Sequence, residues 1–313
     1  MFARSLVAVC CLLSLHGHSQ QQAPLLRHEL SFTTENDAYL FRKHDAYYTN
    51  GFFLRFTTAA ARNNRKVVRS YELGQMIYTP LIRKTQTAAD IDRPYCGFLY
   101  GKYTRSAFTA GEGVLQYSAT LGVVGAASWG EGLQESYHSL FGYGQFTGWK
   151  YQVQNAVGVD LGILYAKTVW QDSSWAKLVP VVQASVGGNY TFARAGAYLC
   201  FGALEKNRNS ILWNARVQQR EASLYRRIEF FVFWYPEVEW QGYNATVQGG
   251  LFSKGTGAVL ANPERLMLQH TIGICCAGAK CSAKLGIVFQ DREATSQKTP
   301  QQYASLQFSY RMR

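Results

Sequence analysis

The chain contains no long hydrophobic run after its N-terminal segment. No later stretch approaches the roughly 18 consecutive apolar residues that a membrane-spanning helix requires. Internal repeats, low-complexity tracts and linker-like segments are also missing. These absences exclude a helical membrane protein and a repeat protein, and they predict a single domain.

A complete disulfide framework is excluded as well. Seven cysteines are present, and two of them lie in the N-terminal segment. The other five are Cys96, Cys200, Cys275, Cys276 and Cys281. An odd number cannot pair completely. Cys276 and Cys281 flank a short turn and could bridge a hairpin, although free thiols facing lipid agree with the sequence at least as well.

The N-terminal segment has the pattern of a secretory signal. Arg4 precedes an apolar run over residues 6–15, and Gly17 and Ser19 are small residues at cleavage spacing. The run is too short to span a bilayer comfortably as a helix. We therefore predict a signal peptide over residues 1–19 and a mature domain over residues 20–313.

The chain is rich in aromatic residues and glycine, with 20 Tyr, 18 Phe, 7 Trp and 28 Gly. Apolar and polar residues alternate clearly at 114–123 and 303–312. This combination predicts an all-β fold, a transmembrane antiparallel β-barrel in the outer membrane, with a soluble secreted β-protein as the alternative. We place about 12 strands, at residues 26–36, 47–59, 66–78, 93–105, 113–125, 150–168, 176–188, 193–205, 226–250, 266–276, 281–290 and 303–312.

The segment 226–250 is long for one strand, and Pro236 inside it predicts a bulge or an edge irregularity. A barrel of about 14 strands is therefore the main competitor. With the N-terminus in the periplasm, the predicted extracellular loops are residues 37–46, 79–92, 126–149, 189–192, 251–265 and 291–302. Residues 131–140 are expected to form a short helix in the third of these loops.

The formal charge of +12 indicates an anionic partner. Nucleic acid is a poor partner for an exported barrel, and we expect none. Phosphorylated glycolipid or anionic headgroups fit better, because Lys and Arg pair with phosphate. Arg83, Lys84 and Arg93 lie near the third and fourth strands and are candidate substrate contacts. A contact between Asp92 and Arg93 at the rim, with Arg83 and Lys84 solvated, explains them equally well.

Two polar clusters are predicted to meet at the extracellular rim. Asn36 and Asp37 end the first strand, and Thr49 begins the second, so a hairpin brings them together. Their carboxylate, carbonyl and hydroxyl oxygens suit calcium, and a simple turn cap is the competing interpretation. Gln134 and His138 are spaced i,i+4 on the predicted helix and share a face, where histidine can act as a general base.

Taken in order, these segments resemble the family of outer-membrane lipid A 3′-O-deacylases, LpxR. The matching segments are residues 35–37, 45–51, 75–80, 92–95, 134–138 and 148–149. The chain departs from the family pattern at Ile91 and Cys96, and it ends in Arg313 rather than an aromatic residue. Arg83 and Lys84 lie near the family's basic substrate contacts but out of register with them.

The resemblance implies a barrel of about 12 strands whose site lies between the wall and a loop helix. It implies that His138 activates a water, that Asn36 and Asp37 hold Ca²⁺, and that Thr49 and Gln134 support the site. The implied reaction is calcium-dependent hydrolysis of the 3′-linked acyl ester of lipid A by a monomer. An outer-membrane phospholipase and a non-catalytic pore or adhesin are the alternatives.

Overall fold

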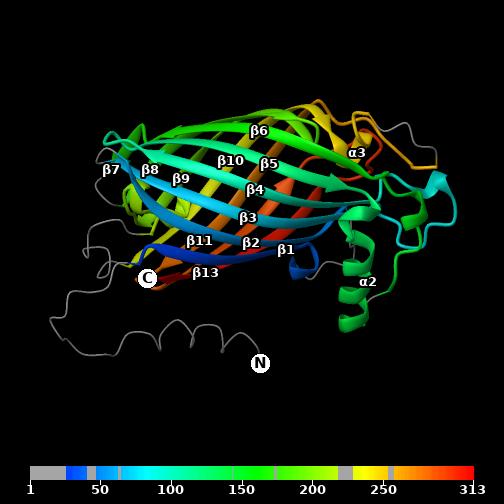
Figure 1. The fold of residues 1–313 in the computed structure, drawn as a ribbon, viewed down its shortest axis with the longest axis horizontal. Helices are drawn as coiled ribbons and strands as arrows, with labels where there is room; N and C mark the ends of the chain where they lie inside the picture. Colours follow the sequence, from blue (N-terminus) through cyan, green and yellow to red (C-terminus); the bar gives the residue numbers. More distant parts are fainter. Residues whose placement is uncertain are drawn as a thin grey trace.

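The computed structural model describes residues 26–40, 47–62, 65–142, 144–172, 175–217, 228–252 and 257–313. The predicted signal peptide and its cleavage site lie outside these residues. The described chain forms a closed antiparallel barrel, because each long strand pairs with the next and β1 also pairs with β13 (Figure 1). The barrel and the outer-membrane location that it implies agree with the sequence prediction.

Twelve long strands build the wall, and a short strand, β7, is added beside β8. The long strands are β1 (His28–Asn36), β2 (Tyr47–Arg62), β3 (Arg65–Thr79), β4 (Cys96–Phe108), β5 (Gly113–Val124), β6 (Ala156–Lys167), β8 (Ala176–Gly187), β9 (Tyr190–Ala203), β10 (Glu229–Asn244), β11 (Leu266–Ala277), β12 (Cys281–Gln290) and β13 (Gln301–Met312). Strand β7 spans Trp170–Asp172, and β6 pairs directly with β8.

The competing count of 14 strands is wrong, because residues 229–244 form one continuous strand. Pro236 sits opposite His270 with no shift in the pairing of β10 and β11. The register shift in β10 lies between Gln241 and Tyr243, on its side facing β9. The length of the segment therefore reflects one long strand that bulges after the proline.

The alternation of side chains follows from the two environments of the wall. Leu54, Leu73 and Leu121 are exposed on the outer face, where lipid would cover them. The residues between them face the lumen, where Arg55 forms an ion pair with Glu72. Side chains of a strand alternate between faces, so one register serves both environments.

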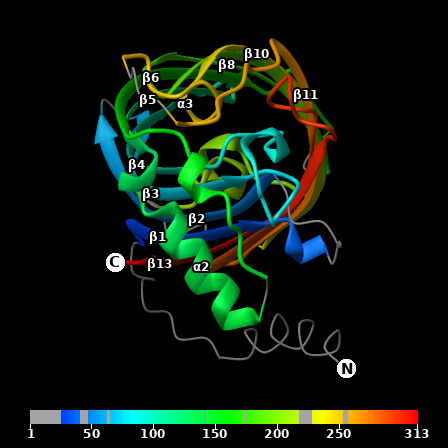
Figure 2. The same cartoon turned by 90° about the vertical axis from the view of Figure 1, so that its right-hand side faces the viewer.

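The two ends of the barrel differ, and Figure 2 views the molecule from the end that carries the helices. We call this the loop end. It carries α2 (Gly130–Phe141) and α3 (Ala245–Gln248), and the expected helix at 131–140 is confirmed as α2. Short 3-10 turns lie at η1 (Ala38–Leu40), η2 (Ala88–Asp90), η3 (Ala126–Ser128) and η4 (Trp149–Tyr151). Within the described ranges, no helix has the length and apolar character needed to cross a membrane.

The opposite end, which we call the turn end, holds an apolar plug. Residues 204–217 follow β9 and include η5 (Asn207–Asn209) and η6 (Ile211–Trp213). Ile211, Leu212 and Trp213 are buried in a cluster with residues of the surrounding strands. Arg216 pairs with Glu229 at 3.2 Å, and both side chains are almost fully buried. The plug occupies the lumen at this end.

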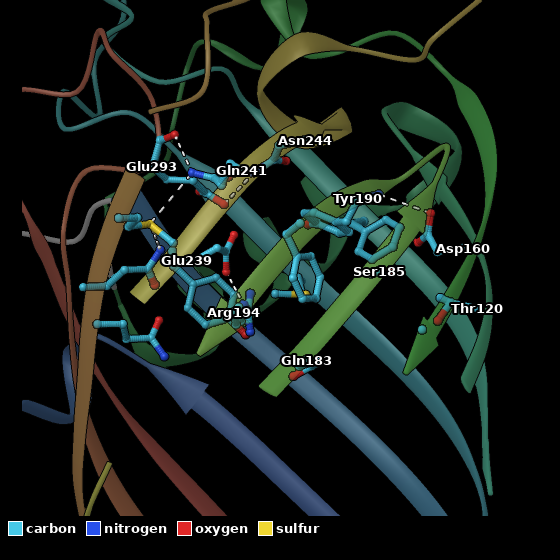
Figure 3. A pocket seen from close by; sticks show the side chains of 18 of the residues that line it. Thr120, Asp160, Gln183, Ser185, Tyr190, Arg194, Glu239, Gln241, Asn244 and Glu293 are labelled. Carbon is cyan, nitrogen blue, oxygen red and sulfur yellow. Dashed lines mark hydrogen bonds and ion pairs between the residues drawn. The ribbon is translucent and has the colours of Figure 1, made fainter. Parts of the chain in front are cut away.

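The lumen between the two ends encloses a cavity of about 290 Å³. Its lining is polar and rich in tyrosine (Figure 3). Arg194 forms an ion pair with Glu239 there, and Asn244 donates a hydrogen bond to Glu293 at 2.8 Å. The lining includes none of the five residues predicted to be catalytic. The lumen cavity is therefore separate from the predicted site.

Within the described ranges, none of the five cysteines outside the N-terminal segment forms a disulfide. Ala277 pairs with Ser282 across the β11–β12 hairpin, and Cys276 lies opposite Ala283. Cys276 and Cys281 are therefore offset along the hairpin instead of facing each other. Of the two possibilities that the sequence left open, the structure has the free thiols.

Candidate active site between the barrel wall and helix α2

The wall side of the site is a row of residues on the outer face of the barrel at the loop end. Asn36 lies opposite Asn50, Asn50 opposite Ile77, and Ile77 opposite Gly97. The same face of these strands carries lipid-facing residues further down, such as Phe32 and Leu54. Asn36, Asn50 and Ile77 are nevertheless buried, so other parts of the protein cover this part of the wall.

Hydrogen bonds fix the polar groups of this row. The side-chain amide of Asn36 donates to Asn50 Oδ1 at 2.5 Å, and Asn36 Oδ1 accepts from the backbone N–H of Ala38 at 2.6 Å. This second bond turns the chain at the end of β1 and places Asp37 beside the row, with 3% of its surface exposed. The structure thus brings Asn36 and Asp37 together at the end of β1.

Thr49 lies at a β-bulge, because the register of β2 with β3 shifts between Tyr48 and Asn50. A bulge adds a residue to one strand and redirects the side chains beside it. Thr49 is fully buried and its hydroxyl donates to the carbonyl of Ile77 at 3.2 Å. The bulge thus allows Tyr48 to face the lumen while Asn50, two residues later, joins the outer row.

Helix α2 reaches the wall because two glycines meet. A Cβ atom added at Gly97 would overlap Ser128 Oγ and lie 2.8 Å from the Cα of Gly130. The helix begins after Trp129, whose left-handed φ of 58° redirects the chain at that point. Further along the helix, the rings of Tyr137 and Phe52 lie 6.3 Å apart. These two contacts hold α2 against the outer face of β2 to β4.

Gln134 and His138 lie on the helix face that begins with Gly130, because residues four apart share a face. Each is only 1% exposed. His138 Nδ1 lies 2.7 Å from the carbonyl oxygen of Gly144. A carbonyl can only accept, so the neutral ring carries its proton on Nδ1 and its lone pair on Nε2. This tautomer is the one that a general base requires.

The amide of Gln134 is oriented by one hydrogen bond. Trp149 Nε1 donates to Gln134 Oε1 at 3.1 Å, and Trp149 packs against Tyr95 and Phe146. Since the oxygen accepts this bond, the NH₂ group points the other way. Gln134 Nε2 is buried and has no hydrogen-bond partner within the described residues. A buried donor of this kind is costly unless a ligand or water accepts from it.

The basic residues predicted to contact substrate divide into two groups. Arg83 lies over the ring of Phe146 at 5.8 Å, and the same ring lies 5.5 Å from the ring of His138. Lys84 follows it and is exposed. These two residues therefore border the site at its solvent side.

Arg93 lies elsewhere, and its predicted contact with substrate does not agree with its burial. Its guanidinium is fully buried, donates to Glu293 at 2.6 Å and to Thr246 at 3.0 Å, and covers the ring of Tyr78. These bonds tie three loop-end segments together. The pattern of a basic residue beside an aspartate did not distinguish a structural ion pair from a ligand contact.

The oxygen donors at Asn36 and Asp37 are of the chemical types that bind a calcium ion. Asp37 contributes one carboxylate and follows Asn36, whose side chain is hydrogen-bonded to Asn50, the residue after Thr49. Calcium prefers carboxylate, amide and hydroxyl oxygens of these types. Among the described residues there is no group of three His, Cys, Asp or Glu side chains that would suit a zinc-type site. A site here would rely on one carboxylate and on neutral oxygens.

Four residues of this arrangement had no predicted role: Asn50, Gly97, Gly130 and Trp149. A glycine within a strand signals close backbone approach, so Gly97 carried a usable signal. The role of Trp149 depends on a contact with a residue 15 positions away, and no local pattern predicts it. Trp149 and Asn50 both lie in the segments that carry the family resemblance.

The comparisons with known proteins identify the family and support the fold. The family model for outer membrane protein LpxR matches residues 6–312. The solved structure of LpxR from Salmonella typhimurium is similar with a TM-score of 0.73 at 18% identity, covering 90% of this chain and 99% of that chain. No curated protein sequence matches the chain.

The translocator domain of the autotransporter NalP from Neisseria meningitidis is a more distant barrel. The match covers 99% of this chain and 94% of that chain at 12% identity, with a TM-score of 0.43. The family match instead spans nearly the whole chain, including the wall row, the bulge and helix α2. The chain belongs to the LpxR family of outer membrane proteins.

Proposed function

We propose that this protein is a calcium-dependent lipid A deacylase that hydrolyses the 3′-linked acyloxyacyl ester of lipid A. The family match supports the coarser part, a lipid A hydrolase of the outer membrane. The finer part rests on one observation: a histidine with its lone pair on Nε2 and a buried amide donor without partner share one face of α2. That face begins at Gly130, which contacts Gly97 in the wall row that also contains Asn36 and Asn50.

The reaction needs a base, and His138 is placed to provide it. Its Nε2 accepts a proton from a water molecule as the water oxygen bonds to the ester carbonyl carbon. The hydrogen bond from Nδ1 to Gly144 holds the ring in this tautomer and stabilises the imidazolium that forms. The proton then passes to the sugar oxygen as the carbon–oxygen bond breaks. The products are a free fatty acid and a lipid A hydroxyl.

Negative charge develops on the carbonyl oxygen, and donors must face it. Gln134 Nε2 is buried, oriented by Trp149 and able to donate there. Asp37 and Asn36 would hold the calcium ion, with Thr49 supporting the turn beside them. When bound, the ion supplies a fixed positive charge beside the same oxygen.

The basic border of the site favours a phosphorylated substrate. Arg83 and Lys84 lie at its solvent side, where they would meet the phosphates of a glycolipid headgroup. The site residues lie on the outer face of the wall and on α2, so we expect a lipid to reach them sideways from the membrane without leaving it. We expect the enzyme to act as a monomer, since one chain supplies all these groups.

The structure also bears on the two alternative functions, a phospholipase and a pore. A phospholipase would use the same base and ion, and only the headgroup contacts distinguish it. The pore alternative is disfavoured because residues 204–217 fill the turn end of the lumen with a buried apolar cluster. The predicted catalytic residues also lie outside the cavity of the lumen.

The test uses the full-length barrel in detergent micelles, with lipid A and glycerophospholipid supplied as competing substrates. Mass spectrometry of the lipid products locates the acyl chain that is lost. We expect loss of the 3′-linked chain of lipid A, abolished by a calcium chelator and restored by added calcium. Comparable cleavage of glycerophospholipid would favour the phospholipase, and intact lipids with a folded, calcium-loaded barrel would contradict both.

A further inference from the structure

An apolar groove runs along the outer wall below the candidate site. It has a volume of about 630 Å³ and is centred near Gly101 on β4. Leu73 on β3 and Leu121 on β5 flank it, since both pair directly with Gly101. Both leucines are among the exposed apolar residues of the wall. The groove exists because a glycine stands between two rows of larger side chains.

The register connects this groove to the candidate site. Gly97, which contacts the start of α2, lies four residues before Gly101 on the same strand and the same face. Ile77 and Leu73 are related in the same way on β3. Four residues of a strand span about 13 Å. The groove therefore begins about this far below the wall row, in the direction of the membrane interior.

We propose that this groove binds the acyl chain whose ester is cleaved, so that it is the acyl subsite of the enzyme. The proposal rests on the proposed function, which places the ester between α2 and the row that contains Asn50. A chain leaving that point toward the membrane interior runs along the strands and reaches Gly101. Because carbon–carbon bonds of about 1.5 Å zigzag, an extended chain advances roughly 1.3 Å per carbon, and it reaches Gly101 after about ten carbons.

One polar side chain, that of Gln75, lies between the site and the groove. Gln75 lies between Ile77 and Leu73 on the outer face of β3, opposite Phe52 and Leu99. Its side chain is 9% exposed, and Nε2 has no hydrogen-bond partner within the described residues. An acyloxyacyl chain carries a second ester close to the first. An oxygen of that ester would satisfy this donor, whereas an unsubstituted lipid chain would not.

Gly101 also supplies the test, because a side chain fits there without disturbing the barrel. An added Cβ at this position meets nothing within 4 Å. The variant Gly101→Leu should therefore fold and fill the groove. Ala195 is an exposed residue on β9, elsewhere on the wall, and Ala195→Leu is the matched control for added apolar bulk.

The substrates are phosphorylated glucosamine esters with a single acyl chain, from about four to about sixteen carbons long, in detergent micelles. For Gly101→Leu we expect kcat/KM to fall roughly tenfold for chains longer than about ten carbons, with shorter chains cleaved as by wild type. Ala195→Leu should match wild type at every length. A second variant, Leu73→Ala, should weaken the preference for long chains, because it removes one wall of the groove.

The outcomes separate the subsite from the reaction itself. An equal effect of Gly101→Leu at every chain length, or none at any length, would overturn the acyl subsite while leaving the hydrolase intact. Failure of the wild-type barrel to cleave even the short esters would instead count against the proposed function. If Ala195→Leu reproduced the long-chain loss, the groove would be an ordinary lipid contact and the proposal would be wrong.

Discussion

The outer wall site and the lumen both bury polar side chains, but they differ in how those side chains are satisfied. In the lumen, Arg55 pairs with Glu72, Arg194 with Glu239, and Arg216 with Glu229. Beneath α2, the side-chain nitrogens of Gln75 and Gln134 are buried without a partner among the described residues. Arg55 Nη1 in the lumen and Trp213 Nε1 in the plug are also buried without a hydrogen-bond partner among the described residues. The regions therefore differ in kind: the lumen buries charged groups in ion pairs, whereas both unpaired donors beneath α2 are side-chain amides, which a ligand or water can satisfy.

The same contrast appears in how the two regions are closed. The turn end is closed by apolar side chains that pack together in the plug, so this end offers no site that exchanges with solvent. The space beneath α2 is closed by two glycines in backbone contact at one end of the helix. Further along the helix, the contact between Tyr137 and Phe52 also holds α2 on the wall. Changes in the two regions should therefore affect different properties.

The largest effect is expected from His138→Ala. Removing the base should lower kcat by roughly a hundredfold to ten-thousandfold. The folded fraction should not change, since His138 lies in a loop helix outside the barrel. The measurement is the initial rate of fatty acid release, with heat-modifiable electrophoretic mobility as the control for folding. Retained activity would remove His138 from the mechanism.

A smaller loss is expected when the oxyanion donor is removed or misoriented. Gln134→Leu should lower kcat by roughly a hundredfold, with little change in KM. Trp149→Phe keeps an aromatic ring but removes the indole N–H that orients Gln134, so we expect a fall in kcat of roughly tenfold. In the double variant the loss should equal that of Gln134→Leu alone. Additive losses would show that Trp149 acts independently of Gln134.

The contact of α2 with the wall is tested by Gly97→Val. The added side chain would collide with Ser128 and Gly130, so the helix must move. Because a displacement near 1 Å can lower a rate by about a hundredfold, we expect activity to fall by about that factor. Proteolysis should cleave the loop that carries α2 faster, with the barrel itself intact. Ala195→Val, at an exposed position on β9 away from helix α2 and the groove, is the control.

The smallest effect on activity is expected at the turn end. Arg216→Met leaves Glu229 buried without its ion partner, which should lower the free energy of unfolding by about 3–5 kcal/mol. The rate per folded barrel should stay within about twofold of wild type, because the plug is separate from the site. Urea unfolding and the esterase rate measure the two quantities on one preparation. A large loss of rate would show that the two ends are coupled.

Sequence predicted most of the fold because a membrane barrel leaves a strong pattern. Lipid on one face and polar groups on the other impose alternation, and about 12 strands and the helix at 131–140 followed from it. The plug at residues 204–217 was not predicted, since a turn-end segment that folds into the lumen has no periodicity of its own. Pro236 indicated an irregularity, and the pairing of β10 with β9 skips Tyr235 and Pro236, although the register itself shifts only between Gln241 and Tyr243.

The sequence predicted which residues belong to the candidate site better than it predicted the role of each residue. Asn36, Asp37, Thr49, Gln134 and His138 were named from strand ends and helix spacing. In the sequence, Arg93 and Arg83 are both basic residues near the third and fourth strands. In the structure, Arg93 is fully buried against Glu293. Only tertiary contacts separate a basic residue that binds substrate from one that ties loops together. The hydrogen bond between Trp149 and Gln134 likewise depends on folding.

The position of the site is tested most directly by a comparison of His138→Ala with Arg216→Met in one experiment. Each variant is expressed in the same host, and mass spectrometry of its lipid A is normalised to the amount of folded barrel. We predict that His138→Ala leaves lipid A unchanged, whereas Arg216→Met removes the 3′-linked chain as fully as wild type per folded molecule. Deacylation by His138→Ala, or its loss in folded Arg216→Met, would contradict a site confined to the outer wall beneath α2.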